Sequence, residues 1–191
     1  MSDRLPVTET MLANARLPEI YWDTSMYQHQ QEHIRFFENI PKWLKTNECV
    51  LLLGDPGTGK TGFTSVVLKE ALSLSHRSLY VCAAEVPEFY SQKLSAADNS
   101  DTGANRLRNA SLLIIDAVSG DRESSHLVSY LLRFRYQQKK PTILATNSKS
   151  AEIKKKYPSD LRRTMKHVCR QIILFRVVHQ PPLDFFKDMT E

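Results

Sequence analysis

The chain has 191 residues, of which 41% are hydrophobic and 25% charged, and its net charge is +5, which is the balance of one compact domain with a buried core. No apolar run of about 18 residues occurs, so we expect no membrane span, and the polar start MSDRLPVTET lacks the apolar region of a secretory signal. The cysteines Cys49, Cys82 and Cys169 are far apart in sequence, which favours reduced thiols in a cytoplasmic protein and argues against a disulfide or zinc site.

Apolar runs and helical patterns alternate along the chain. Residues 1–25 are polar and interrupted by proline, so we expect an extended lead-in, and the helical pattern of residues 26–45 should kink or end at Pro41. The next elements are expected in this order: strand 49–54, helix 59–73, strand 78–84, helix 86–94, polar loop 95–106, strand 111–116, helix 123–138, strand 141–147, two basic helices at 151–157 and 159–168, strand 170–178 and a loose tail at 179–191. Strands that alternate with helices predict an α/β fold: a three-layer arrangement around a five-stranded parallel sheet.

The stretch GDPGTGKT carries the most specific motif. It fits the pattern G-x-x-x-x-G-K-[ST], follows a buried strand and opens a helix, which is the context of a phosphate-binding loop. Glycines let backbone N–H groups approach phosphate oxygens at the positive end of the helix, the lysine reaches the β- and γ-phosphates, and the threonine hydroxyl serves Mg²⁺. We predict that ATP is bound by Gly54, Asp55, Pro56, Gly57, Thr58, Gly59, Lys60, Thr61 and Gly62.

Asp116 ends the apolar run LLIID and is the expected partner of Thr61 at Mg²⁺, because an unpaired carboxylate is costly inside a core. A hydrolytic site of this type usually has a glutamate next, as the base that orients the attacking water. This chain has Ala117, and a methyl group accepts no proton. Asp121 or Glu123 could replace the missing acid, or Asp121 could simply cap the following helix. The sequence therefore predicts slow or partner-dependent turnover, or a switch that binds ATP without hydrolysing it.

Three further side chains are candidates for catalysis beside Lys60 and Asp116. Asn147 ends the strand PTILATN, where its amide could contact the γ-phosphate or a water molecule, although it could also cap a turn. Arg162 or Arg163, in SDLRRTM, could reach the γ-phosphate of a neighbouring subunit and stabilise transition-state charge. The alternative for both arginines is contact with nucleic acid or a solvated helix face.

Positive charge is concentrated near these arginines. The segment from Lys149 to Arg176 contains nine lysines and arginines but only two acidic residues, Glu152 and Asp160. Its net charge is therefore +7, which leaves −2 for the rest of the chain. A concentrated basic face favours a polyanionic partner such as nucleic acid, and a solvated surface is the alternative.

Together, LLLGDPGTGKT, LLIID, ILATNS and DLRRTM resemble the AAA+ family of bacterial replicative-helicase loaders, DnaC and DnaI, and the related transposition ATPase IstB. The resemblance covers about residues 17–178, and ARLPEIYWDTS is similar to the segment that precedes the ATPase core in that family. It implies a P-loop AAA+ core at residues 26–178, without a helical lid after Val178. It also places phosphate binding on residues 54–61, Mg²⁺ on Thr61 and Asp116, sensing on Asn147 and the trans-acting arginine at Arg162 or Arg163.

The resemblance implies a DNA-replication accessory protein that binds ATP, contacts single-stranded DNA, and assembles with itself or with a replicative helicase. Two features depart from the family: Ala117 replaces the acid, and the usual N-terminal helicase-binding domain is absent or cut to about twenty residues, as in a compact phage or mobile-element version. Three alternatives stay open: an IstB-like transposition helper that prefers duplex DNA, a non-hydrolysing nucleotide switch, and a small-molecule kinase.

Overall fold

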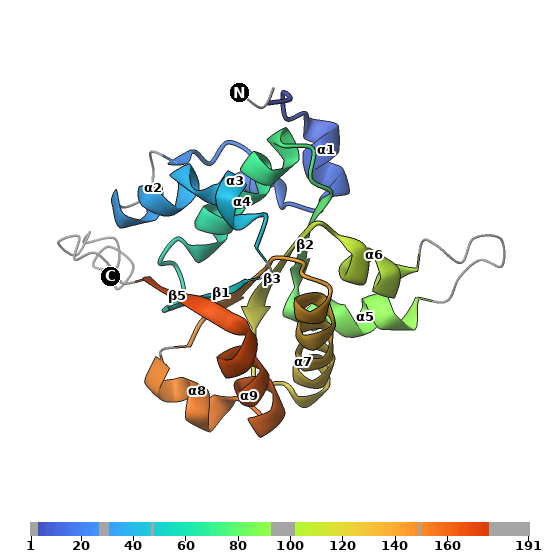
Figure 1. The fold of residues 1–191 in the computed structure, drawn as a ribbon. Coiled ribbons are helices and arrows are strands. Elements are labelled where there is room, and N and C mark those ends of the chain that lie inside the picture. Colours follow the sequence, from blue (N-terminus) through green and yellow to red (C-terminus); the bar gives the residue numbers. More distant parts are fainter. Residues whose placement is uncertain (1–3, 27–30, 47, 93–101, 149, 176–191) are drawn as a thin grey trace, which may run out of the picture.

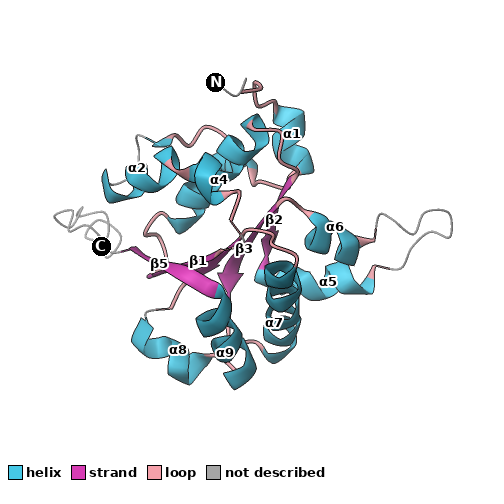
Figure 2. Cartoon of the chain, viewed as in Figure 1, coloured by secondary structure: helices cyan, strands magenta, loops and turns pink. Residues whose placement is uncertain are grey.

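The chain folds around a central sheet that has helices on both faces (Figure 1). The structure is a computed structural model and describes residues 4–26, 31–46, 48–92, 102–148 and 150–175. In Figure 2 the magenta strands lie between two groups of cyan helices, which gives three layers. The predicted α/β class and the three-layer arrangement are therefore confirmed.

The element order alternates between strands and helices after an N-terminal group of helices. That group consists of α1 (Glu9–Asn14), η1 (Glu19–Tyr21), α2 (Gln31–Glu38) and α3 (Ile40–Trp43). The alternating part consists of β1 (Cys49–Gly54), α4 (Lys60–Ser73), β2 (Ser78–Cys82), η3 (Ala83–Glu85), α5 (Val86–Ser91), α6 (Gly103–Asn109), β3 (Leu112–Val118), α7 (Arg122–Gln137), β4 (Thr142–Thr146), α8 (Ser150–Lys156), α9 (Ser159–Val168) and β5 (Cys169–Phe175).

The strand order of the sheet is β2-β3-β4-β1-β5, and every neighbouring pair described is parallel. Along β1 and β3 alternate residues enter two different cores, because successive side chains of a strand point to opposite faces. Val50 and Ile114 pack with α2, α3 and α4, whereas Leu51 and Ile115 pack with α5, α7 and α9. Both faces of the sheet are therefore buried, which explains why the strand sequences are continuous apolar runs.

The parallel order sets the location of the predicted site. The carboxyl ends of β3, β4 and β1 lie next to one another at the same end of the sheet, because β4 pairs with both other strands. Asp116 near the end of β3, Asn147 directly after β4 and Gly54 at the end of β1 are thereby brought to the same end of the sheet although they are far apart in sequence. Ligands of open parallel sheets bind at this carboxyl edge.

Two secondary-structure expectations were wrong. The N-terminal lead-in is not extended, since α1 begins at the cap Thr8, whose Oγ1 accepts from the Met11 N–H (3.3 Å), and Leu12 is buried in the core. The polar loop expected at 95–106 ends earlier, because Thr102 caps α6 through the Asn105 N–H (3.1 Å). Residues 93–101 and the tail 179–191 lie outside the described residues, so neither the rest of that loop nor the tail is tested.

The break expected at Pro41 is confirmed, because α2 and α3 are separate helices and Pro41 lies in the first turn of α3. Two cysteines meet across the β1–β5 pair: the Cys169 thiol donates to Cys49 Sγ at 3.1 Å, and both are free thiols. Burial raises the pKa of the Cys49 thiol, which favours its protonated form. Among the described helices, none has the length and apolar character that a bilayer crossing requires.

Candidate nucleotide site

The loop between β1 and α4 has the backbone of a phosphate cradle. Gly57 and Gly59 have φ angles of 75° and 92°, in the left-handed region that side chains with a Cβ rarely adopt. Thr58 Oγ1 donates to the Asp55 carbonyl (2.8 Å) and holds the turn together. The N-terminus of α4 follows directly, so its free N–H groups and partial positive charge face the space enclosed by the loop.

Lys60 lies inside this loop and is only 5% exposed. Its ammonium group donates to the carbonyls of Gly54 (2.9 Å) and Asp55 (2.7 Å) and to Thr58 Oγ1 (3.3 Å). Burial lowers the pKa of Lys60, while the negative charges of Asp116 and Asp55 oppose that shift. The loop thus holds a partly desolvated cation where a phosphate would replace the carbonyls as its partner.

Asp116 is the centre of a hydrogen-bond network at the end of β3. Its Oδ2 accepts from the hydroxyls of Thr61 (2.8 Å) and Tyr80 (2.7 Å), and its Oδ1 accepts from the Ala117 N–H (2.7 Å). The side chain is 6% exposed, so these donors replace lost hydration of the carboxylate. The predicted partnership of Thr61 and Asp116 is present in the structure: their oxygen atoms are in direct contact.

Tyr80 was not among the predicted site residues. It lies on β2, and burial raises the pKa of its phenol, with further contributions from the charge and the hydrogen bond of Asp116. The phenol therefore stays a neutral donor that fixes the carboxylate. No sequence signal marks it, because its contact depends on the side-by-side position of β2 and β3.

Replacement of Tyr80 by phenylalanine should weaken Mg²⁺-dependent ATP binding about threefold to tenfold, because Asp116 loses one of its three donors and its fixed orientation. Titration of labelled ATP with Mg²⁺ and with EDTA would measure the effect. Tyr90→Phe is the matched control, since the Tyr90 hydroxyl has no hydrogen-bond partner in the described part of the chain. Equal affinities for both variants with Mg²⁺ would show that Tyr80 does not position the carboxylate.

Ala117 lies at a bulge in β3, where the pairing with β4 shifts register between Ile115 and Val118. Its φ angle is 52° and its side chain is exposed, so the missing acid would project from a strained, solvent-facing position. Asp121 does not replace it in this structure, because Asp121 Oδ2 accepts from the Ser124 N–H (2.9 Å) and caps α7. The helix-cap interpretation of Asp121 is confirmed, and its bonds with Ser124 lower its pKa.

The remaining predicted residues are Asn147, which lies at the same end of the sheet as Asp116, and the two arginines of α9. Asn147 is exposed and follows Thr146, which pairs with Leu53, so the amide is at the level of Gly54 on the neighbouring strand. On α9 Arg162 is half-buried, whereas Arg163 is exposed. The structure therefore brings Lys60, Thr61, Asp116 and Asn147 to one sheet edge, and it leaves one of the two arginines accessible to a neighbour.

The residues present fit ATP and Mg²⁺. A desolvated lysine and a helix N-terminus suit phosphate, and a hydroxyl in contact with a carboxylate provides the oxygen ligands that Mg²⁺ prefers. A search by family finds that residues 50–172 match the profile of the AAA family, the ATPase family associated with various cellular activities. The chain belongs to this family. No curated protein matches it in sequence.

Several solved structures with the same fold are named as DNA-replication proteins. This AAA chain aligns with a DNA replication initiation factor at 18% identity (TM-score 0.63), covering 80% of this chain and 49% of that one. It aligns with the DnaC helicase loader at 16% identity (TM-score 0.64), covering 83% and 99% of the two chains. The replication initiator DnaA, bound to AMPPCP and single-stranded DNA, aligns at 17% identity (TM-score 0.61), covering 83% and 50%. The chain thus spans about half of the initiation factor and of DnaA, and nearly all of the DnaC structure.

Proposed function

We propose that this AAA protein is an ATP-binding accessory factor of DNA replication, of the helicase-loader type, which binds single-stranded DNA or a replicative helicase when ATP is bound. The observation that supports it most is the buried Lys60 of the loop beside the hydrogen-bonded pair Thr61 and Asp116, in a domain that aligns with nearly the whole DnaC helicase loader structure. The fold alone does not assign a function, so the proposal depends on this site and on the surface beside it.

Each residue of the site has a distinct part in the proposed mechanism. Lys60 exchanges its carbonyl partners for phosphate oxygens, and the backbone N–H groups of the loop bind the remaining phosphate charge. Thr61 and Asp116 would hold Mg²⁺, which when bound neutralises charge on the β- and γ-phosphates. Asn147 orients the end of the phosphate chain or a water molecule. Arg163 is the better candidate for a trans-acting arginine, because it is the exposed one of the pair.

The basic surface next to the site supports a link between ATP and a polyanion. Lys154 and Lys155 on α8 are exposed, and so is Arg163 on α9. The end of α8 is attached to the nucleotide edge, because the Tyr157 hydroxyl, which follows α8, contacts the Val118 carbonyl (2.7 Å) at the end of β3 and Ser148 (3.2 Å) after β4. A change at the strand ends can therefore move the basic helix and alter its affinity for DNA phosphates.

One further candidate is a nucleotide switch that does not hydrolyse ATP. The residues at and after the end of β3 favour it. Ala117 has no group that can act as a base, and the carboxylate of Asp121 already accepts hydrogen bonds as the cap of α7. In that case ATP would change only the relative populations of two conformations, and a partner would bind one of them better.

Magnesium-dependent ATP turnover, with and without single-stranded DNA, tests the proposal in the wild type and in Ala117→Glu. We expect slow wild-type turnover that single-stranded DNA stimulates, and a gain of about tenfold or more in Ala117→Glu if only the base is missing. A matched duplex arm separates the loader from an IstB-like helper, which should prefer duplex.

Two results decide between the candidates. ATP binding without wild-type turnover in any arm, together with turnover gained by Ala117→Glu, would support the switch, whereas no gain in Ala117→Glu would count against Ala117 as its cause. No effect of single-stranded DNA or of a replicative helicase on ATP binding or turnover would contradict the loader proposal, even if the protein hydrolyses ATP.

A further inference from the structure

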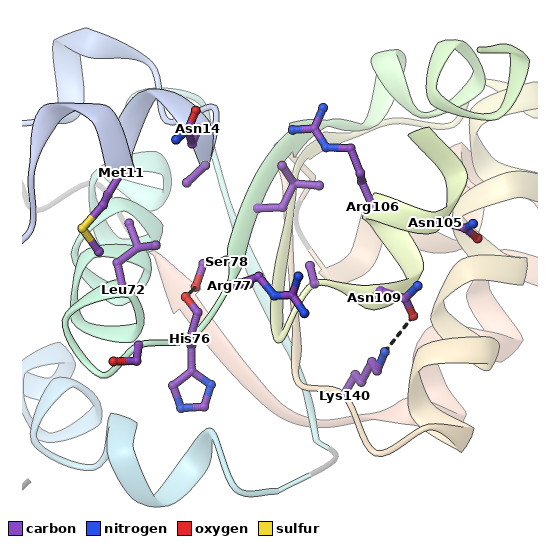
Figure 3. Close-up of a pocket in the computed structure, with 14 residues that line it drawn as sticks. Met11, Asn14, Leu72, His76, Arg77, Ser78, Asn105, Arg106, Asn109 and Lys140 are labelled. Carbon is purple, nitrogen blue, oxygen red and sulfur yellow. Dashed lines mark hydrogen bonds between the residues drawn. The ribbon is translucent and has the colours of Figure 1, made fainter. Parts of the chain in front are cut away.

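A second concave site lies at the opposite end of the sheet from the nucleotide loop. It has a volume of about 840 Å³ and lies between α1, the turn that leads into β2, the end of α6 and the residue Lys140 before β4 (Figure 3). We call it the β2 groove. It adjoins β2, which is an edge strand, so the outer side of β2 pairs with no other strand of the described sheet.

The walls of the β2 groove are basic. Arg77, Arg106, Lys140 and His76 line it, and none of the described residues that line it is an aspartate or glutamate. Lys140 donates to the side chain of Asn109 (3.1 Å), and Figure 3 shows Arg77 directed toward this pair. Burial lowers the pKa of Lys140, and the positive charges of Arg135 and Arg77 lower it further.

The arginines of the groove lack a counter-charge, in contrast to two arginines elsewhere on the surface. Arg4 pairs with Glu70 at 2.6 Å and Arg16 pairs with Glu85 at 2.7 Å. Within the described residues, neither Arg77 nor Arg106 has an ion pair, although both are exposed. Like charges held close together without an anion repel each other, so a bound anionic group would relieve that repulsion.

The apolar residues of the groove favour one kind of anion. Met11, Ala15, Leu72 and Leu79 also line it, and Figure 3 shows Met11 and Leu72 on the other side of β2 from Arg106 and Lys140. Side chains of an extended peptide alternate in direction, so a groove with basic and apolar sides suits a peptide in which acidic and aliphatic side chains alternate.

The outer side of β2 offers one backbone position to an extended peptide. The Ser111 N–H donates to the Arg77 carbonyl (2.7 Å) toward β3, whereas the Tyr80 N–H points the other way and donates to the Ala15 carbonyl (2.8 Å). The next outward N–H, that of Cys82, donates to Glu85 Oε2 (2.8 Å). Ser78 is two residues before Tyr80 and directs its backbone groups to the same outer side, into the groove, where a peptide could bond to them.

We propose that the β2 groove is a docking site for an extended acidic–aliphatic peptide segment of a partner protein. Its carboxylates pair with Arg77, Arg106 and Lys140, and its aliphatic side chains contact Met11, Leu72 and the other apolar lining residues. The site is separate from the nucleotide loop, so this proposal goes beyond the replication function and does not depend on ATP hydrolysis.

Fluorescence anisotropy of a fluorescein-labelled peptide of four Asp-Leu repeats tests the proposal with the full chain. The test variant is Arg77→Glu combined with Arg106→Glu, and the control is Lys154→Glu combined with Lys155→Glu, which changes the charge equally on α8. All four side chains are exposed, so both double variants should fold, which circular dichroism would verify. We expect the groove variant to bind the peptide about tenfold or more weakly and the control to lose less than about twofold.

Several outcomes would overturn the proposal. They are equal losses in the two double variants, equal binding of a Lys-Leu repeat peptide, or no binding of the acidic peptide by the wild type at low salt. Displacement of the peptide by an oligo-dT strand that binds more tightly and is sensitive to the groove variant would assign the groove to nucleic acid instead. ATP binding should be unchanged in the groove variant and peptide binding unchanged in Lys60→Ala, so failure here is distinguishable from failure of the replication function.

Discussion

Replacement of Lys60 by alanine is expected to weaken ATP binding by about two orders of magnitude, which corresponds to about 2.7 kcal/mol. The reason is the position of its ammonium group, which bonds to the Gly54 and Asp55 carbonyls and is poorly hydrated. A charge-assisted bond formed in such surroundings with phosphate is stronger than one on an open surface. The alanine variant loses it without any substitute, since no other lysine or arginine is in the loop.

Thermal unfolding with increasing Mg²⁺-ATP would measure this loss. A ligand that binds only the folded state stabilises it by RT ln(1 + [L]/Kd), so the wild type should gain about 2.7 kcal/mol at one hundred times its Kd and Lys60→Ala almost nothing. Lys69→Ala is the matched control, because Lys69 is a half-buried lysine on the same helix that donates to the carbonyls of Trp22 and Thr24. It should lower the melting temperature yet keep the ATP-dependent gain. An unchanged gain in Lys60→Ala would contradict the assignment of the loop.

The nucleotide site was predictable because its signals are local. Gly57 and Gly59 of the loop motif allow the positive φ angles that the turn requires. The motif also lies between a run of apolar residues and a helix, which is its expected context. The positions of Asp116 and Asn147 were predictable because a polar residue that ends an apolar run lies at or near the carboxyl end of a parallel strand, although β3 continues to Val118. Such inferences need only the element order, which apolar runs and helical periodicity provide.

Residues that act through tertiary contacts were not predictable. Tyr80 contacts Asp116 only because β2 pairs with β3, and the sequence offers an ordinary apolar strand there. The helix α1 was missed because it is short and has few apolar residues, so its sequence shows no clear helical periodicity. Its stability depends on the packing of Leu12 in the core. The β2 groove is formed by segments that are far apart along the chain, so its unpaired cations have no local pattern.

Arg135 shows the largest difference between sequence and structure. It lies in α7 among amphipathic residues, where an exposed arginine would be expected, yet it is 0% exposed. Its guanidinium donates to the carbonyls of Leu107 (3.0 Å) and Ala110 (2.8 Å) at the end of α6, and of Pro141 (2.8 Å) before β4. Burial lowers its pKa to about 9, so the group is still charged at neutral pH, and its positive charge complements the C-terminus of α6. One side chain therefore joins three segments that the sequence separates.

Replacement of Arg135 by methionine should lower the free energy of unfolding by about 3–5 kcal/mol, because buried carbonyls at the end of α6 and before β4 lose their donor at once. Urea unfolding measures the loss as a lower midpoint at constant slope. Arg133→Met is the control on the same helix, since Arg133 is exposed and donates to Thr164 (2.9 Å), and it should cost less than about 1 kcal/mol. If Arg135→Met does not fold, Arg135→Lys retains the charge with fewer donors and should give an intermediate loss. Equal stabilities of the Arg133 and Arg135 variants would show that the joined carbonyls contribute nothing to the fold.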